Sequence, residues 1–248
     1  NVYYLLCGLI LISFIFLLFS KIEYEVEAIG SSLKEDLMES VKLMVIPLVL
    51  VFIISAFLFV MIEQGIMTWL PRSNEKIFLF SEKLSVRMAI IFALSLALGR
   101  FVAGYLTKRI SWVYLVIICI VISGGILLIV LPQLNVDVDT LAKIESIADV
   151  PLLGYILPLI GLFIAPIYPL LNSTVLSSLP KNLHSPMSGL IIIFSALGGT
   201  IGSRIVGELF ESIGGAKAFY FLLIPMLLLI IFVLLIDKIS KKNALKES

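Results

Sequence analysis

Full charges are rare inside the long apolar runs of this sequence, and the three that lie away from the ends of these runs are the first candidates for chemistry. Glu63, Arg100 and Arg204 each lie within such a run. A charge in apolar surroundings is costly and usually faces the interior of a helical bundle or a water-filled cavity. Gln64 and Trp69 follow Glu63 on the same segment. An aromatic ring can stack on a sugar, and amide or carboxylate groups bind hydroxyls, so we predict that Glu63, Gln64 and Trp69 line a solute site.

Each of these residues also has a structural interpretation. Glu63 can order the end of its helix, and Trp69 can belong to the aromatic belt found at membrane interfaces. We expect a gating or ion-pair role for Arg100, either with a carboxylate outside this chain or by snorkelling to the inner interface. For Arg204 the expectation is snorkelling or a pair with Glu208, four residues further on.

A second candidate group lies on a segment that glycine and proline interrupt repeatedly. The interruptions within 151–177 are Gly154, Pro158, Gly161, Pro166 and Pro169. Broken membrane helices free backbone groups that a ligand or water can satisfy, and in transporters they point to the substrate site. We predict that Tyr168 and Asn172 contact the solute. The alternative is that they hydrogen-bond the freed backbone.

The elements that position these residues are long apolar blocks. Hydrophobic residues make up 60% of the 248 and charged residues 14%, against roughly a quarter charged in soluble domains. A helix needs about 20 residues to cross the hydrocarbon, and barrel strands would be shorter and alternate in polarity. The sequence therefore predicts an all-α integral membrane protein of about seven spans, near 2–19, 43–70, 84–106, 112–131, 151–177, 186–206 and 216–237.

Charges in the connections predict the orientation. One side collects ten lysines and arginines, Lys21, Lys34, Lys42, Lys108, Arg109, Lys181, Lys238, Lys241, Lys242 and Lys246, and the other collects six. The richer side should be cytoplasmic. We therefore expect a multi-pass protein of the cell (inner) membrane with Asn1 outside and the C-terminus inside. The expected divisions are a helix at 1–20, a cytoplasmic connector at 21–40, a six-helix unit at 41–237 and a cytoplasmic tail at 238–248.

Two turns of the chain suggest an internal repeat. Gly104, Leu106 and Ile110 match Gly207, Leu209 and Ile213 at a constant offset of 103 residues. An offset of three helices reverses the direction of crossing, which is the layout of a three-plus-three inverted repeat. Small residues at Gly198, Gly199, Gly202, Ser203 and Gly207 form stripes that favour close helix packing.

Four runs of the sequence resemble fucose-permease-like sugar transporters of the major facilitator superfamily. Residues 63–71 (EQGIMTWLP) resemble the end of the seventh helix of that family, and 99–109 (GRFVAGYLTKR) the end of the eighth. Residues 165–169 (APIYP) with Asn172 resemble the tenth helix, and 198–202 (GGTIG) the eleventh. The order and spacing of the runs match the family over nearly the whole chain.

The resemblance implies helices six to twelve of a twelve-helix carrier, with 21–40 as the linker between its halves. Because the chain starts at Asn1 without a methionine, we expect it to begin within a longer protein, after helices one to five. The implied function is secondary transport of a sugar or similar small polar solute, with a proton as the coupling ion (fucose, galactose or hexose:proton symport). The loop after Gly104 lacks the acidic residue and second arginine of the superfamily's best-known loop motif, and the family's coupling acids lie largely in the other half.

Two other function classes fit the sequence less well. A seven-helix receptor, or another non-transport membrane protein, fits the helix count, but the last span lacks both an Asn-Pro-x-x-Tyr motif and a central lysine. An enzyme is not expected, because the apolar blocks contain no paired acids and no nucleophile with a base. No cofactor or metal site is predicted. The net charge of +1 gives no reason to expect nucleic acid as a partner.

Overall fold

A computed structural model describes residues 2–20, 38, 40–134 and 144–247. Residues 1–35 and 36–248 form two separate units, and the first contains helix α1 (Val2–Phe19), which is apolar and matches the predicted span. The predicted connector at 21–40 lies outside the described residues except for Met38 and Ser40.

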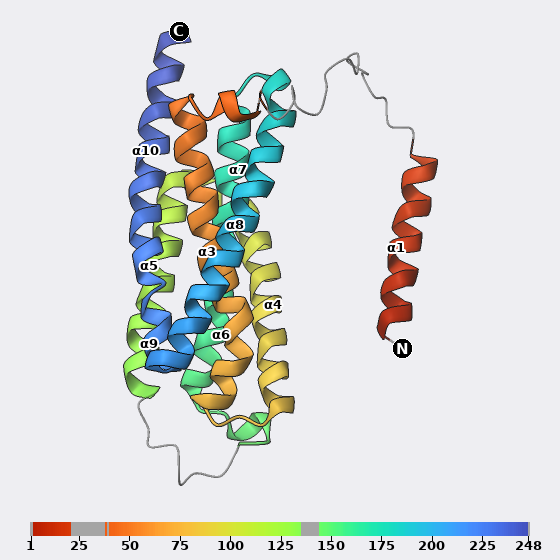
Figure 1. Cartoon of the computed structure of the whole chain (residues 1–248), viewed down its shortest axis with the longest axis vertical. Coiled ribbons are helices and arrows are strands. Elements are labelled where there is room, and N and C mark those ends of the chain that lie inside the picture. Colours follow the sequence, from red (N-terminus) through yellow and green to blue (C-terminus); the bar gives the residue numbers. More distant parts are fainter. Residues whose placement is uncertain (1, 21–37, 39, 135–143, 248) are drawn as a thin grey trace. The chain divides into compact units, whose positions relative to one another are not determined.

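The second unit contains six apolar segments long enough to cross a membrane within the described part of the chain. They are α3 (Pro47–Lys76), α4 (Glu82–Leu106), α5 (Trp112–Val130), α6 with α7 (Leu152–Ile164 and Ile167–Ser177), α8 (His184–Ile213), and α9 with α10 (Gly215–Tyr220 and Leu223–Glu247). Short 3-10 turns at Leu131–Leu134, Ile147–Asp149 and Lys181–Leu183 lie in the connections. Successive segments run in opposite directions (Figure 1). The prediction of a helical membrane bundle is confirmed.

Local sequence explains where several of these helices begin and end. Pro47 starts α3, where the missing N–H of proline removes no helical hydrogen bond. The Ser81 hydroxyl accepts a hydrogen bond from the Leu84 N–H at 3.4 Å and caps α4. Gly214 ends α8 with φ of 92°, a conformation that glycine adopts without the steric cost other residues incur.

Some boundaries differ from the predicted ones. α3 continues past Pro71 to Lys76, so Glu63 lies near the middle of its helix, further from the C-terminal end than the predicted span 43–70 implies. The span predicted at 151–177 is two helices, broken at Ala165 and Pro166. α8 and α10 extend beyond the spans predicted for them, because polar residues at their ends continue the helical hydrogen bonding.

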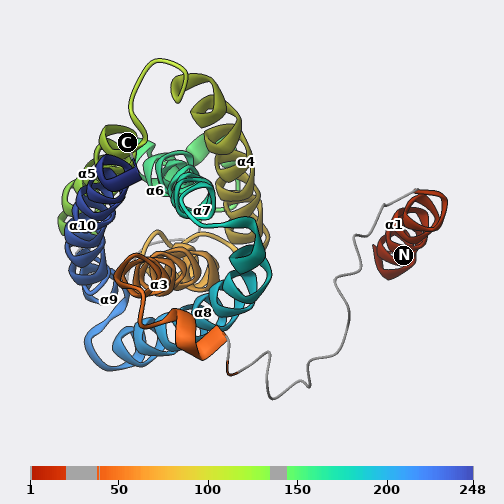
Figure 2. The same cartoon turned by 90° about the horizontal axis from the view of Figure 1, so that it is seen from above.

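The core of the six-helix unit forms around α3 and the α6–α7 segment. α3 packs most extensively against α8 and α10, and α6 packs most extensively against α4 and α5. Viewed from above, α3 and α6–α7 lie in the middle, with α4, α5, α8 and α10 around them (Figure 2). Buried side chains fill the spaces between the helices, the largest being Phe52, Phe59, Phe80, Phe92 and Phe219.

Two close helix contacts agree with the predicted repeat. A Cβ atom at Gly99 of α4 would overlap the carbonyl oxygen of Leu162 on α6. A Cβ atom at Gly202 of α8 would lie 2.5 Å from the carbonyl oxygen of Met61 on α3. Gly99 and Gly202 are 103 residues apart, the offset of the repeat. Within the six-helix unit, the corresponding helices of the two three-helix repeats run in opposite directions (Figure 1), as an inverted repeat requires.

Candidate functional site

Two of the three predicted intramembrane charges form an ion pair. Nη2 of Arg100 on α4 lies 3.4 Å from Oε1 of Glu63 on α3. The arginine side chain is 53% exposed and the glutamate side chain 15%. The structure therefore places the partner of Arg100 within this chain, whereas we had expected either an outside carboxylate or snorkelling. The pair compensates both charges and still leaves most guanidinium donors free for other acceptors.

Gln64 lies beside this pair on α3 and packs against α8. A Cβ atom at Gly199 would lie 3.1 Å from Cγ of Gln64, so the stem of the glutamine rests on the bare backbone of Gly199. The side chain of Gln64 is only half-buried. Its amide can therefore donate to and accept from a solute while its stem fixes its position.

The Tyr168 side chain joins α7 to both α8 and α3. Its hydroxyl lies 3.1 Å from the Ser195 hydroxyl on α8, and either oxygen can donate the hydrogen. The Tyr168 ring stacks on Phe59 of α3, with ring centroids 5.5 Å apart and planes 20° apart. Phe59 precedes Glu63 by about one helical turn. The Tyr168 ring thus contacts α3 about one turn before Glu63, which belongs to the ion pair.

Asn172 follows Tyr168 by about one turn of α7. Its side-chain oxygen is buried and has no hydrogen-bond partner among the described residues. A buried acceptor without a donor costs about 1–3 kcal/mol. A hydroxyl of a solute or an ordered water could donate a hydrogen bond to this oxygen on the broken helix.

These groups lie at similar depth. Glu63 and Gln64 are near the middle of α3, Tyr168 is near the middle of the Leu152–Ser177 span, and Ser195 is near the middle of α8. Such a set of polar groups on the middle of several apolar helices is typical of a transporter substrate site.

Trp69 is held differently from the other predicted site residues. Its indole N–H donates to the Ser203 carbonyl at 2.8 Å, and its ring stacks on Phe210 with centroids 5.4 Å apart. A Cβ atom at Gly207 would overlap the indole. The structure therefore joins Trp69 to α8 towards the C-terminal ends of α3 and α8 and not to the Glu63 pair, which favours the structural interpretation.

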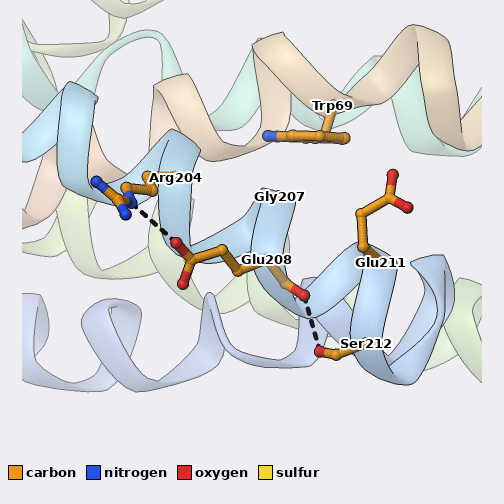
Figure 3. Close-up of a pocket in the computed structure, with 6 residues that line it drawn as sticks. All are labelled: Trp69, Arg204, Gly207, Glu208, Glu211 and Ser212. Atoms are coloured by element: carbon orange, nitrogen blue, oxygen red, sulfur yellow. Dashed lines mark hydrogen bonds and ion pairs between the residues drawn. The ribbon is translucent and has the colours of Figure 1, made fainter.

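Trp69 also forms one wall of a shallow, open hollow over α8 (Figure 3). In this hollow, Arg204 Nε lies 2.8 Å from Oε1 of Glu208, and both side chains are exposed, 79% and 67%. The predicted Arg204–Glu208 pair is thus present. Exposed i, i+4 pairs contribute little stability, and we assign it no role in solute binding.

The region around Glu63, Gln64 and Tyr168 also contains Phe59, Ser195 and Gly199. These three were not predicted as site residues. The spacing of small residues on α8 predicted close packing for Gly199, and the structure shows that the packed partner is Gln64. Nothing in the sequence around Phe59 or Ser195 distinguishes them from other core or helix residues. Only the packing of α3 against α7 and α8 does.

Comparison with known proteins gives the family. The chain is similar in fold to the crystal structure of a variant of the E. coli fucose:proton symporter, FucP, with a TM-score of 0.69 and 16% identity, covering 95% of this chain and 54% of that one. FucP in the outward conformation matches equally, with TM-score 0.69 and 16% identity, covering 94% and 53%.

The chain thus spans about half the length of these structures. No curated protein sequence matches it. The sequence profile of the Major Facilitator Superfamily matches residues 1–203, most of the chain. The match agrees with the expectation of a membrane transporter and not an enzyme. This chain belongs to the major facilitator superfamily.

Proposed function

We propose that this chain is the C-terminal half of a secondary active transporter for a sugar or a similar small polar solute. In this proposal, α1 is helix six, 21–40 is the linker between the halves, 41–237 is the second half and 238–248 is a cytoplasmic tail. The family, and the share of FucP that the chain covers, support this assignment. Transport would proceed by alternating access, with helices one to five supplying the facing wall of the site.

The observation that carries the proposal is the polar set at the middle of the bundle. Glu63 and Arg100 form a compensated pair, so the described residues of the site present no net charge to a solute. Around the pair, Gln64, Tyr168 and Asn172 supply an amide, a hydroxyl and an unsatisfied acceptor. Neutral hydroxyl-bearing solutes match this chemistry, because each hydroxyl donates and accepts.

Proton coupling is part of the same proposal. FucP is named a fucose:proton symporter, and Glu63 is the carboxylate of the described site. A glutamate paired with an arginine can take up a proton when the pair separates, which would couple protonation to the movement of α3 against α4.

A transport assay on reconstituted protein tests this function. The chain joined to its preceding helices should take up labelled hexoses saturably in proteoliposomes, and residues 1–248 alone should not, because one wall of the cavity is then missing. In the complete carrier, Glu63→Gln loses charge-assisted hydrogen bonds, so apparent affinity should fall roughly tenfold to a hundredfold.

Matched controls separate the roles of Glu63. Glu208→Gln also removes a carboxylate paired with an arginine, but on the exposed hollow of α8, and it should leave uptake unchanged. Counterflow that survives Glu63→Gln while pH-driven accumulation disappears would assign Glu63 to proton coupling and not to solute contact. Saturable uptake by residues 1–248 alone would contradict the half-carrier assignment.

A further inference from the structure

The exposed face of α10 changes abruptly from apolar to basic near its C-terminal end. Large apolar side chains follow one another on this face at helical spacing, namely Ile224, Leu227, Leu228, Ile231, Leu234 and Leu235. Lys238, Lys241 and Lys242 come next and are also exposed. At 100° per residue, the lysines continue the same face as the apolar side chains. A face of exposed leucine and isoleucine on a membrane helix contacts lipid, so the lysines lie where that contact reaches the headgroups.

The surroundings of these lysines are basic as well. Lys42, Lys108, Arg109 and Lys181 are exposed at the same end of the six-helix unit. Among the side chains that the structure describes there, Asp237 is the one carboxylate, and its oxygen accepts a hydrogen bond from Lys241 at 2.7 Å. The opposite end mixes cations with acids, for example Lys76 with Glu75 and Lys83 with Glu82. A positive field with a single compensating acid among the described side chains attracts anions.

We propose that Lys238, Lys241 and Lys242 form a binding surface for the headgroups of anionic phospholipids. This assignment needs a membrane-spanning α10 whose apolar face meets lipid, and it does not depend on the proposed transport function. Basic segments that directly follow a membrane helix are attracted to anionic lipid surfaces, with each lysine strengthening binding about fivefold.

The position of the lysines favours lipid over a soluble phosphate. All three are exposed and lie on the same face of α10 as the exposed apolar side chains. Tyr114, 68% exposed, lies on the first turn of α5, the helix that packs beside α10. Trp112 precedes it on the same turn. Tyrosine and tryptophan concentrate at the headgroup level of membranes, which places the lysines at that level too.

The two tryptophans of the chain lie at opposite ends of the bundle and make the surface measurable. In a Trp69→Phe background, Trp112 reports lipid near the α5 and α10 ends through quenching by brominated acyl chains. The full chain is reconstituted with brominated phosphatidylglycerol or brominated phosphatidylcholine, each diluted into unlabelled phosphatidylcholine. We expect brominated phosphatidylglycerol to quench at lower mole fraction, and the difference to shrink as salt rises, because screening weakens exposed charges.

Three substitutions, Lys238→Gln, Lys241→Gln and Lys242→Gln, should together lower this preference at least about fivefold. The matched control replaces Lys76, Lys83 and Lys217, exposed lysines at the opposite end, with glutamine and should keep the preference. Inorganic phosphate at equal charge concentration should not compete, since it lacks the acyl chain. An equal preference in both triple variants, or none in the parent, would overturn the proposal, and competition by phosphate would assign the lysines to a soluble anion instead.

Discussion

Arg100 and Glu63 form an ion pair between neighbouring helices, 3.4 Å from Nη2 to Oε1, in which the two partners are unequally buried. More than half of the arginine side chain is exposed, but only 15% of the glutamate side chain is. Removing one partner leaves the other uncompensated, and the cost rises with the burial of the group that is left. The pair therefore predicts an asymmetry between two single substitutions.

Arg100→Gln should destabilise the protein more than Glu63→Gln does. The first leaves a buried carboxylate unpaired, which should cost about 1–3 kcal/mol, and the second leaves a guanidinium that is more than half exposed and can turn to other acceptors. Reversible unfolding in mixed micelles with increasing dodecyl sulfate measures the free energy of unfolding. The double variant should recover part of the loss, because it contains neither charge. Equal losses for the two single variants, with no recovery in the double variant, would show that the pair contributes no coupling energy.

The paired glycines of the repeat give a second prediction. Gly99→Ala and Gly202→Ala each place a methyl group against a backbone carbonyl of the facing helix. Backbone cannot move aside as a side chain can, so each should lower the free energy of unfolding by about 1–3 kcal/mol. Gly125→Ala is the control, since the space around Gly125 is open within 4 Å, and its melting temperature should be unchanged or higher. If only one of the two core variants is destabilised, the contacts are not equivalent and the repeat loses this support.

The sequence predicted the spans and the intramembrane charges well, because both follow from the cost of polar groups in lipid. It did not predict that Arg100 pairs with Glu63. The two residues are 37 positions apart on different helices, and only their packing decides which partner each one finds. Pro166 and Pro169 marked the α6–α7 segment as broken, which the structure shows. Pro71 was expected near a helix end, yet α3 continues for more than a turn beyond it.

Trp69 shows a further limit of sequence reasoning. A tryptophan near polar residues fits a sugar platform, an interfacial belt or a packing contact equally well, and residue type cannot separate these. Its hydrogen bond to the Ser203 carbonyl and its stack on Phe210 are contacts between α3 and α8 that arise only when the two helices are assembled. The prediction for Trp69 as a solute-binding residue is therefore the one that the geometry supports least.

Trp69→Phe should affect stability and not solute binding. The substitution keeps a ring for the stack on Phe210 but removes the N–H donor, so the part-buried Ser203 carbonyl loses its hydrogen bond from α3 at a cost of about 1 kcal/mol. Trp69→Ala should cost about 3–5 kcal/mol, since the ring is lost too. Melting temperature and solute affinity are measured on the same preparations. A large fall in affinity for Trp69→Phe at unchanged melting temperature would instead place the indole in the solute site.

The hydroxyl of Tyr168 separates solute contact from helix packing most directly. Tyr168→Phe removes this hydroxyl and keeps the stack on Phe59, while Ser195→Ala removes the other half of the same hydrogen bond. If the bond serves only to join α7 to α8, both variants lose similar stability and neither changes affinity. We expect Tyr168→Phe alone to weaken solute binding, about twofold to tenfold for one neutral hydrogen bond. In Ser195→Ala the tyrosine hydroxyl is still present and is free to turn towards a solute.

The measurement is equilibrium binding of labelled hexose to the complete carrier in detergent, together with the melting temperature of each variant. Equal affinities in the parent and both variants would assign Tyr168 to packing and leave Glu63, Gln64 and Asn172 as the polar groups of the site.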